Sequence, residues 1–198
     1  MIIGLTGASG SGKSYAAAFF AEKGFFVIDF DKISREICGN GEPCLKELTE
    51  HFGNDIIDSE GNLKRKVLGD IVFKNPENLS LLNSITHKYI LKKSEMLKRE
   101  NSDKIIVYDA PLLFEAGLDK ECDTIISIIC DTGIKLERII SRDGISKETA
   151  MGRIKSQKDN KYYIENSDYH IENNSTPEEF ILKLENLLKE LNINGDCS

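Results

Sequence analysis

Eight residues near the start of the chain, Gly7-Ala-Ser-Gly-Ser-Gly-Lys-Ser14, decide how the fold is interpreted. Their spacing is G-x-x-x-x-G-K-[ST], which is typical of a phosphate-binding loop. They follow a short apolar run, residues 1–6, and precede a segment of helical composition that stops at Gly24. This strand–loop–helix context is the one that the motif requires, and it favours a functional loop over an ordinary glycine–serine turn.

The loop predicts a binding site for a nucleoside triphosphate. Glycine leaves room for backbone N–H groups to turn toward an anion, and the N-terminus of the following helix adds partial positive charge. Lys13 can reach the β- and γ-phosphates, and the Ser14 hydroxyl can bind Mg²⁺. The predicted nucleotide-binding residues of this segment are Gly7, Ala8, Ser9, Gly10, Ser11, Gly12, Lys13, Ser14 and Tyr15.

The composition excludes several classes of protein. Among 198 residues, 33 are acidic and 26 basic, and the net charge of −7 argues against a general binder of nucleic acid or anionic membranes. The five cysteines contain no C-x-x-C pair, which indicates free thiols rather than a disulfide framework or a zinc site. No apolar run approaches the length of about 18 residues that a membrane span needs, and the N-terminus lacks a signal-peptide pattern. We expect a cytoplasmic protein.

Apolar runs that alternate with helical segments predict five strands, near residues 1–6, 25–28, 104–109, 123–130 and 167–171. Continuous apolar strands are typical of a parallel sheet that is covered on both faces. The fold class predicted is therefore α/β, a three-layer α/β/α nucleotide-binding fold with a five-stranded parallel sheet. We divide the single unit into a core (1–38, 102–135 and 165–192), a helical substrate-binding insertion (39–101) and a lid (136–164).

Two aspartates follow the second predicted strand, in Asp29-Phe30-Asp31. Strand C-termini line the ligand crevice of an open α/β sheet, so these carboxylates are expected on the side of the phosphate site. If the chain stays extended, both lean to one side, and one of them can accept a proton from an attacking hydroxyl. The plainer alternative is that one aspartate caps a helix that starts near Lys32.

The insertion should be helical, with short helices near 44–52 and 63–73 and a long helix from Pro76 to about Arg99. About sixty helical residues are more than a simple crossover between strands requires. Arg65, His87 and Lys88 are its candidate anion contacts, although a lone histidine is more often a plain surface or packing residue. Asp109, at the end of the third predicted strand, is a candidate for contact with Mg²⁺-bound water or for positioning the acceptor; capping is the alternative.

Three arginines lie in the predicted lid: Arg138, Arg142 and Arg153. A guanidinium fork can bind two oxygens of a transferring phosphoryl group at once, whereas surface ion pairs with Glu137, Asp143 and Glu148 are the alternative. Residues 158–167 are polar and expected to be mobile. Asn173-Asn174 has the composition of a turn, and Ser175-Thr-Pro-Glu178 predicts a capping box for a last helix to about Leu191, before a frayed tail, 192–198.

Taken together, these segments resemble the dephospho-coenzyme A kinases, relatives of the nucleoside-monophosphate kinases. The resemblance runs from Ile2 to about Leu188. Its more specific parts are the strand-end pair in Val27-Ile-Asp-Phe-Asp31 and the segment Asp109-Ala-Pro-Leu-Leu-Phe-Glu115. Further matches are Gly61-Asn-Leu-Lys-Arg65, Lys135-Leu-Glu-Arg138, Ser141-Arg-Asp143, Arg153-Ile-Lys-Ser-Gln157 and Asp168-Tyr-His-Ile-Glu-Asn173.

The resemblance implies MgATP-dependent phosphorylation of the ribose 3′-hydroxyl of dephospho-CoA. It implies a general-base role for Asp31 and a role for Arg142, supported by Arg138, on the transferring phosphate. Asn173 would lie near the ATP adenine. Acceptor contacts would come from Asp31, Arg65, His87, Asp109 and Leu112. The partners implied are small molecules, with no nucleic acid or membrane, for a monomer or weak homo-oligomer.

The chain departs from the family pattern at Lys88, where proline usually follows the histidine, and at Ser167 and His170. The basic run before Ser167 is thinned to Lys158 and Lys161. Another small-molecule kinase of the same fold remains an alternative. A GTP-binding switch is a third, but it expects an Asn-Lys-x-Asp motif that this sequence lacks.

Overall fold

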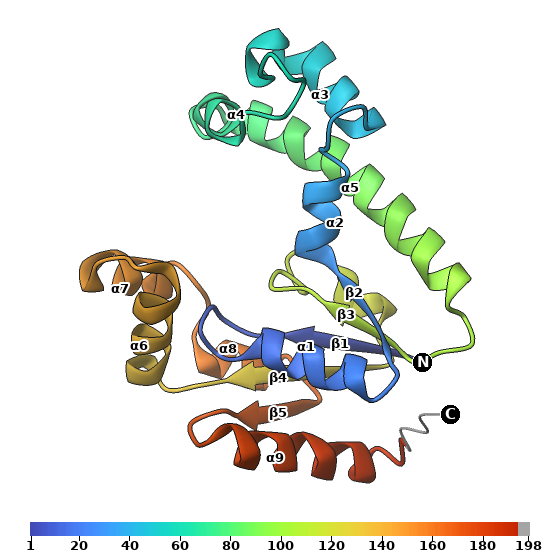
Figure 1. Cartoon of the computed structure of the whole chain (residues 1–198), viewed down its shortest axis with the longest axis vertical. Coiled ribbons are helices and arrows are strands. Elements are labelled where there is room, and N and C mark those ends of the chain that lie inside the picture. The colour runs from blue at the N-terminus through green and yellow to red at the C-terminus, as the bar shows by residue number, and fades with distance from the viewer. Residues whose placement is uncertain (194–198) are drawn as a thin grey trace. The chain divides into compact units, whose positions relative to one another are not determined.

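The structure is a computed structural model that describes residues 1–193 (Figure 1). Five strands form one sheet in the order β2-β3-β1-β4-β5, with parallel registers between the pairs β1–β3, β1–β4 and β4–β5. The strands are β1 (Ile2–Thr6), β2 (Phe26–Asp29), β3 (Ile106–Asp109), β4 (Thr124–Ile129) and β5 (Tyr169–Glu172). The predicted α/β fold with a five-stranded parallel sheet is confirmed.

The helices follow the strands in a regular α/β alternation, apart from a helical stretch between β2 and β3. Near the sheet they are α1 (Lys13–Glu22), η2 (Leu118–Glu121), α6 (Thr132–Asp143), α7 (Lys147–Lys155), α8 (Asn160–Glu165) and α9 (Pro177–Glu190). The stretch between β2 and β3 holds α2 (Phe30–Glu36), α3 (Pro43–Phe52), η1 (Asn54–Ile56), α4 (Arg65–Val72) and α5 (Pro76–Glu100). Within residues 1–193 no helix is long and apolar enough to cross a membrane.

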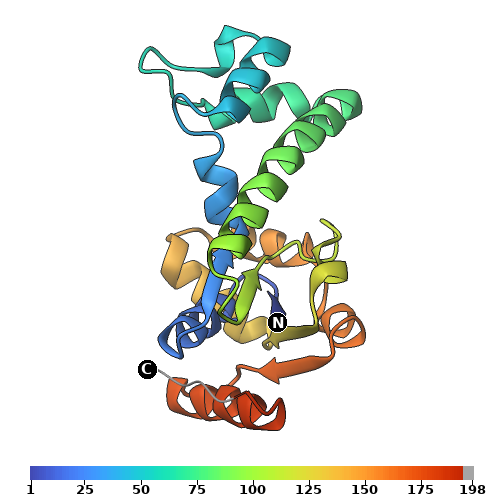
Figure 2. The same cartoon turned by 90° about the vertical axis from the view of Figure 1, so that its right-hand side faces the viewer.

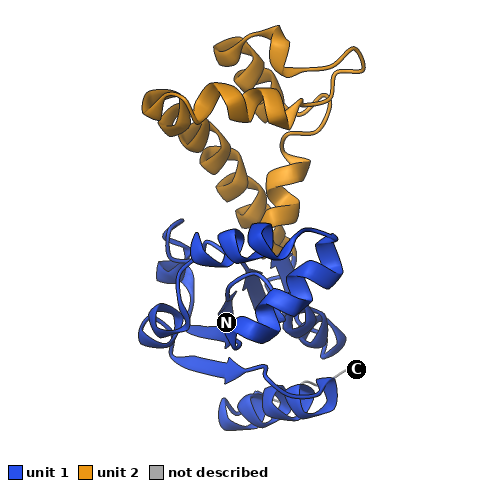
Figure 3. Cartoon of the chain, turned by 90° about the vertical axis from the view of Figure 1, so that its left-hand side faces the viewer, with its two compact units in different colours: residues 1–28, 101–198 blue, residues 29–100 orange. Residues whose placement is uncertain are grey.

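The chain divides into two compact units, residues 1–28 with 101–198, and residues 29–100 (Figure 3). In the first unit, α1 and α9 share one apolar cluster with the sheet, in which Phe20, Ile126 and Leu184 are fully buried. Helices cover the sheet on both sides (Figure 2), and on the second face the Ser127 hydroxyl donates to the Tyr163 carbonyl of α8. The first unit is therefore a layered nucleotide-binding core.

The second unit is helical. The helices α2, α3 and α4 each pack against the long helix α5, and they bury apolar side chains such as Ile33, Leu48 and Val72. The helices predicted near 44–52, 63–73 and 76–99 are confirmed, each with bounds within about two residues. The expected boundary of an acceptor-binding insertion at residue 39, and that of a lid at residue 136, remain predictions.

The structure differs from the local predictions at three places. Residues 160–165 form the helix α8, whose start is capped because the Asp159 carboxylate accepts from the Tyr162 N–H at 2.9 Å. The last helix is capped one residue later than predicted, because Thr176 rather than Ser175 accepts from the backbone, at Glu179. At the start of the predicted tail, Asn192 and Ile193 donate to the carbonyls of Lys189 and Leu188. The rest of that tail, with Cys197, lies outside the described residues.

Candidate active site

The phosphate-binding loop lies where the strand order of the sheet reverses. The strand β1 pairs with β3 on one side and with β4 on the other, and crevices for ligands form at the carboxyl end of such a central strand. Residues 7–12 turn there, and α1 begins at Lys13, as the sequence predicts. The N-terminus of α1 therefore faces the crevice with its unpaired backbone N–H groups.

Two glycines of the loop are required by both space and conformation. Gly7 has a φ of 149°, and a Cβ there would lie 2.4 Å from the Ile128 carbonyl oxygen. Gly12 has a φ of 98°, and a Cβ there would lie 2.0 Å from the side-chain nitrogen of Asn173. A side chain at position 7 would have to displace the backbone of β4, and one at position 12 would have to displace the Asn173 side chain. Both glycines therefore let an anion approach the loop backbone closely.

Lys13 and Asp109 form an ion pair through Nζ and Oδ1. Their side chains are only 12% and 9% exposed, and Asp109 ends β3, where it is in register with Leu5 of β1. Two opposite charges that are this deeply buried must be compensated, and here they compensate each other. The structure thus brings together two predicted site residues, one assigned to the donor and one to the acceptor.

The donor set fits a triphosphate with Mg²⁺. In the described part of the chain no group of three His, Cys, Asp or Glu side chains could hold a metal ion by itself. Hard oxygen ligands are what Mg²⁺ prefers, and it usually keeps waters and phosphate oxygens in its shell. The Ser14 hydroxyl lies in the first turn of α1, and its role as a Mg²⁺ ligand beside the loop remains a prediction.

Arg138 and Asn173 contact the loop from the side of its carbonyl groups. Arg138 Nη1 lies 3.3 Å from the Gly10 oxygen and 3.4 Å from the Ser11 oxygen, and Asn173 Nδ2 donates to the Ser11 oxygen at 2.8 Å. Arg138 Nη2 also lies 3.4 Å from Asn173 Oδ1. These two predicted ATP-binding residues are therefore joined to each other and to the loop backbone.

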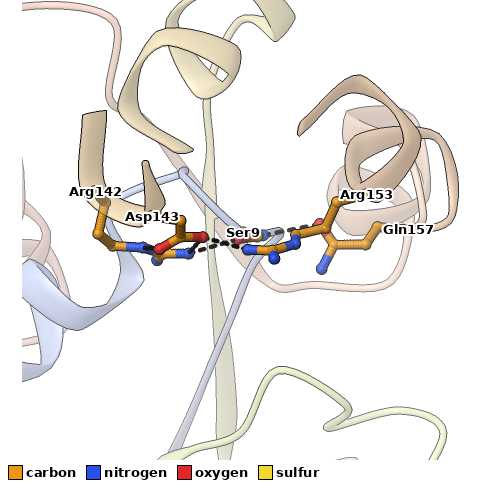
Figure 4. A network of polar contacts seen from close by, with 5 residues as sticks. All are labelled: Ser9, Arg142, Asp143, Arg153 and Gln157. Atoms are coloured by element: carbon orange, nitrogen blue, oxygen red, sulfur yellow. Dashed lines mark hydrogen bonds and ion pairs between the residues drawn. The ribbon is translucent and has the colours of Figure 1, made fainter. Parts of the chain in front are cut away.

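A second polar network connects the loop with α6 and α7 (Figure 4). Arg142 donates to both oxygens of Asp143, at 2.7 and 3.0 Å, and Arg153 forms an ion pair with the same carboxylate. Arg142 Nη2 lies 3.4 Å from Ser9 Oγ, while Gln157 Oε1 accepts from the Ser9 N–H at 3.0 Å. The hydrogen bonds from Arg142 and then Arg153 lower the pKa of Asp143 to about 2, so this carboxylate is ionised at neutral pH.

The sequence predicts no role for Gln157, and it predicts Asp143 only as a partner in surface ion pairs. The sequence indicates Gln157 only through the segment Arg153-Ile-Lys-Ser-Gln157, which matches the family. Asn174 was read as turn chemistry, but its Oδ1 accepts from the Asp131 N–H at 2.8 Å. Lys135 is 4% exposed and donates to Asn160 Oδ1, and burial lowers its pKa. Long-range partners of this kind have no local sequence pattern.

Around Asp31 the chain is not extended, so the condition for both aspartates to lean to one side is not met. The helix α2 begins at Phe30, so Asp29 and Asp31 do not alternate along a strand. The capping alternative is confirmed for Asp29, whose Oδ1 accepts from the Lys32 N–H at 2.9 Å. Asp31 is an exposed residue of the first helical turn, so its carboxylate is left for a role other than capping.

The remaining predicted residues take no part in these networks. Arg65 is the first residue of α4 and His87 lies within α5, and both are exposed. Leu112 is 63% exposed in the segment after β3. The Tyr15 ring lies 6.1 Å from the Phe180 ring and is 46% exposed.

A parallel sheet with a glycine-rich loop, and with a lysine and a serine at the N-terminus of the following helix, defines a P-loop nucleotide-binding protein. The family model described as dephospho-CoA kinase matches residues 1–179. The chain belongs to the dephospho-CoA kinase family.

Individual relatives agree with this assignment. A dephospho-CoA kinase from Fusobacterium nucleatum subsp. nucleatum is 46% identical over 185 residues, which cover 93% of this chain and 95% of that protein. Among solved structures, dephospho-CoA kinase from Campylobacter jejuni superposes with a TM-score of 0.70 at 28% identity, covering 96% of each chain. The protein TT1252 from Thermus thermophilus gives a TM-score of 0.84 at 27% identity and covers 96% of this chain and 97% of that one.

Proposed function

We propose that this chain transfers the terminal phosphate of ATP to the ribose 3′-hydroxyl of dephospho-CoA, which gives coenzyme A and ADP and completes coenzyme A biosynthesis. The observation that carries the proposal is the family match over residues 1–179, together with a phosphate-binding loop in which every residue of the motif is in place. The buried pair of Lys13 and Asp109 supports the donor half of the site.

On the donor side, the backbone N–H groups of residues 7–14 and the Lys13 ammonium group bind the β- and γ-phosphates. Lys13 leaves Asp109 to do so, and its ammonium group exchanges a carboxylate for phosphate oxygens, so that it keeps an anionic partner throughout. Ser14 would hold Mg²⁺ together with phosphate oxygens, and the bound ion would supply further positive charge at the leaving group. Arg142, already near Ser9, turns from Asp143 to the transferring phosphate.

On the acceptor side, Asp31 takes the proton of the 3′-hydroxyl as the oxygen attacks the γ-phosphate. Its exposed position in the first turn of α2, outside any hydrogen bond of the helix cap, supports this assignment. Arg65 and His87 bind anionic or polar groups of the acceptor, and Asp109 and Leu112 contribute further contacts. The protein acts in the cytoplasm as a monomer or weak homo-oligomer. Its partners are small molecules alone, and the net charge of −7 is consistent with the absence of nucleic-acid and membrane partners.

The test is an ADP-release assay with ATP and a panel of acceptors: dephospho-CoA, nucleoside monophosphates and sugar acids. We expect turnover with dephospho-CoA and with its 2′-deoxy analogue, and none with the 3′-deoxy analogue, which lacks the attacking oxygen. Turnover with another acceptor of the panel but none with dephospho-CoA would select a different small-molecule kinase. Turnover of the 3′-deoxy analogue would contradict the proposed position of transfer.

A further inference from the structure

We propose that Asn173 and Arg138 are positioning residues, which hold the phosphate-binding loop by its carbonyl groups so that its N–H groups stay directed at the phosphates. The part of this inference that concerns ATP affinity rests on the proposed function, because that function supplies ATP as the ligand. The structural part concerns the loop alone and is independent of the acceptor.

The need for such a clamp follows from the geometry of a peptide. When successive N–H groups turn toward one anion, the carbonyl groups of the same peptides turn away from it and into the protein. A buried carbonyl without a donor costs about 1–3 kcal/mol, so a loop of this shape is stable only where donors meet its carbonyl side. In this chain the carbonyl groups concerned belong to Gly10 and Ser11, and the donors are Arg138 and Asn173.

Asn173 is well suited to this task because it is itself held rigidly. It is 6% exposed, and its backbone N–H donates to the Ile129 oxygen at 2.9 Å, directly after the paired strands β4 and β5. Both ends of its amide are occupied, with Nδ2 on the Ser11 oxygen and Oδ1 facing Arg138. Aspartate could not replace it, because a carboxylate has no hydrogen to donate and would repel the Ser11 carbonyl.

Arg138 completes the clamp from a different element. It lies on α6, which is fixed by an apolar cluster that includes Ile139 and Ala150. Its guanidinium group spans the Gly10 and Ser11 carbonyl groups and the Asn173 amide, a set of acceptors that a planar fork can meet together and a lysine cannot. The tight approach of Asn173 to Gly12 means that the glycine of the motif and the clamp depend on each other.

The first measurement uses ATP affinity. Asn173→Ala should weaken ATP binding about tenfold, as expected when a buried carbonyl loses its donor, and leave dephospho-CoA binding unchanged. Arg138→Lys should weaken ATP binding as well, although it keeps the charge. The matched control is Asn174→Ala, since Asn174 bonds the Asp131 N–H instead of the loop and should retain the parent affinity. Equal ATP affinity in Asn173→Ala and the parent would overturn the proposal.

The second measurement needs no ligand. Hydrogen exchange of the segment 7–14 in the ligand-free protein should be faster in Asn173→Ala and Arg138→Lys than in the parent and in Asn174→Ala. Unchanged exchange in both variants would overturn the clamp even if the variants were less stable to heat. Faster exchange together with failure of the acceptor panel would leave the clamp standing and reject the proposed substrate instead. If Asn173→Ala does not fold, Arg138→Lys decides both measurements.

Discussion

The two units of the chain prepare their functional residues in opposite ways. In the unit of residues 1–28 and 101–198, Lys13, Asp109, Arg138 and Asn173 are bonded to one another or to the loop backbone. In the unit of residues 29–100, the side chains of Asp31, Arg65 and His87 are exposed, and within residues 1–193 they make no hydrogen bond or ion pair. The proposed donor site is thus preorganised by the protein, whereas the residues proposed for the acceptor are solvated.

This difference predicts how each kind of residue responds to mutation. A preorganised group is part of a network, so its loss affects nucleotide binding, neighbouring charges and folding together. A solvated group has no such dependants, so its loss should change a single kinetic parameter and leave stability unchanged. The following variants test that contrast, from the largest expected effect to the smallest.

Lys13→Ala should have the largest effect. It removes the cation proposed to bind the β- and γ-phosphates, and we expect kcat/KM to fall about 10²- to 10³-fold or more. It also leaves the carboxylate of Asp109 buried without this partner, so the thermal unfolding temperature should fall. The control is Lys23→Ala, near the end of α1, which removes an ion pair with Glu185 that is about one-third exposed. Turnover in Lys13→Ala near that of the control would contradict the assignment of the donor site.

Asp31→Asn should lower catalysis nearly as much but leave nucleotide binding and stability unchanged. Loss of a general base lowers kcat about 10²- to 10⁴-fold, while ATP affinity and unfolding temperature should not change. Asp29→Asn is the matched control, because asparagine caps helices as well as aspartate does and the bond to Lys32 can be kept. If the control lost activity and Asp31→Asn did not, the roles of the two aspartates would be exchanged.

These two variants also mark how far the sequence predicts the structure. The loop 7–14, its strand and its helix were predictable because every element of the motif is local and is carried by backbone geometry. The helix that contains Asp31 begins earlier than the sequence predicts, because the sequence Asp29-Phe-Asp31 is compatible with both an extended chain and a helix cap. The hydrogen bond from Lys32 to Asp29 distinguishes the two. The contacts of Gln157 and Asn173 with the loop join residues about 150 or more positions apart, and no local pattern encodes them.

Arg65→Ala and His87→Ala should have intermediate effects that are confined to the acceptor. Each removes one polar or charged contact to an anionic substrate, and we expect the KM for dephospho-CoA to rise about tenfold with an unchanged KM for ATP. Lys66→Ala, the exposed neighbour of Arg65, controls for a general loss of positive charge. Initial rates with each substrate varied in turn measure both constants. A rise in the KM for ATP would show that the two sets of residues are not as separate as the contacts indicate.

Glu47→Gln should have the smallest effect, and it asks whether the unit 29–100 has any preorganised polar network. Glu47 accepts from Lys88 Nζ at 2.7 Å and from the Tyr89 hydroxyl at 2.6 Å, which joins α3 to α5. The hydrogen bond from Lys88, and then that from Tyr89, lowers the pKa of Glu47. Because the pKa in the folded state is lowered, the network stabilises the fold at neutral pH, and this contribution is lost as the pH falls through that pKa.

The unfolding temperature of Glu47→Gln should therefore be slightly lower than that of the parent at pH 7, and the difference should shrink as the pH falls below the ordinary pKa of a glutamate. Glu50→Gln, on an exposed position of the same helix, should show neither change. Lys88 replaces the proline usual in the family, so the kinetic result decides what this replacement does. An unchanged KM for dephospho-CoA would assign Lys88 to the architecture of the helical unit. A raised KM with unchanged stability would place Lys88 and Glu47 at the acceptor instead. The contrast between a bonded donor site and a solvated acceptor side would then hold only for Asp31, Arg65 and His87.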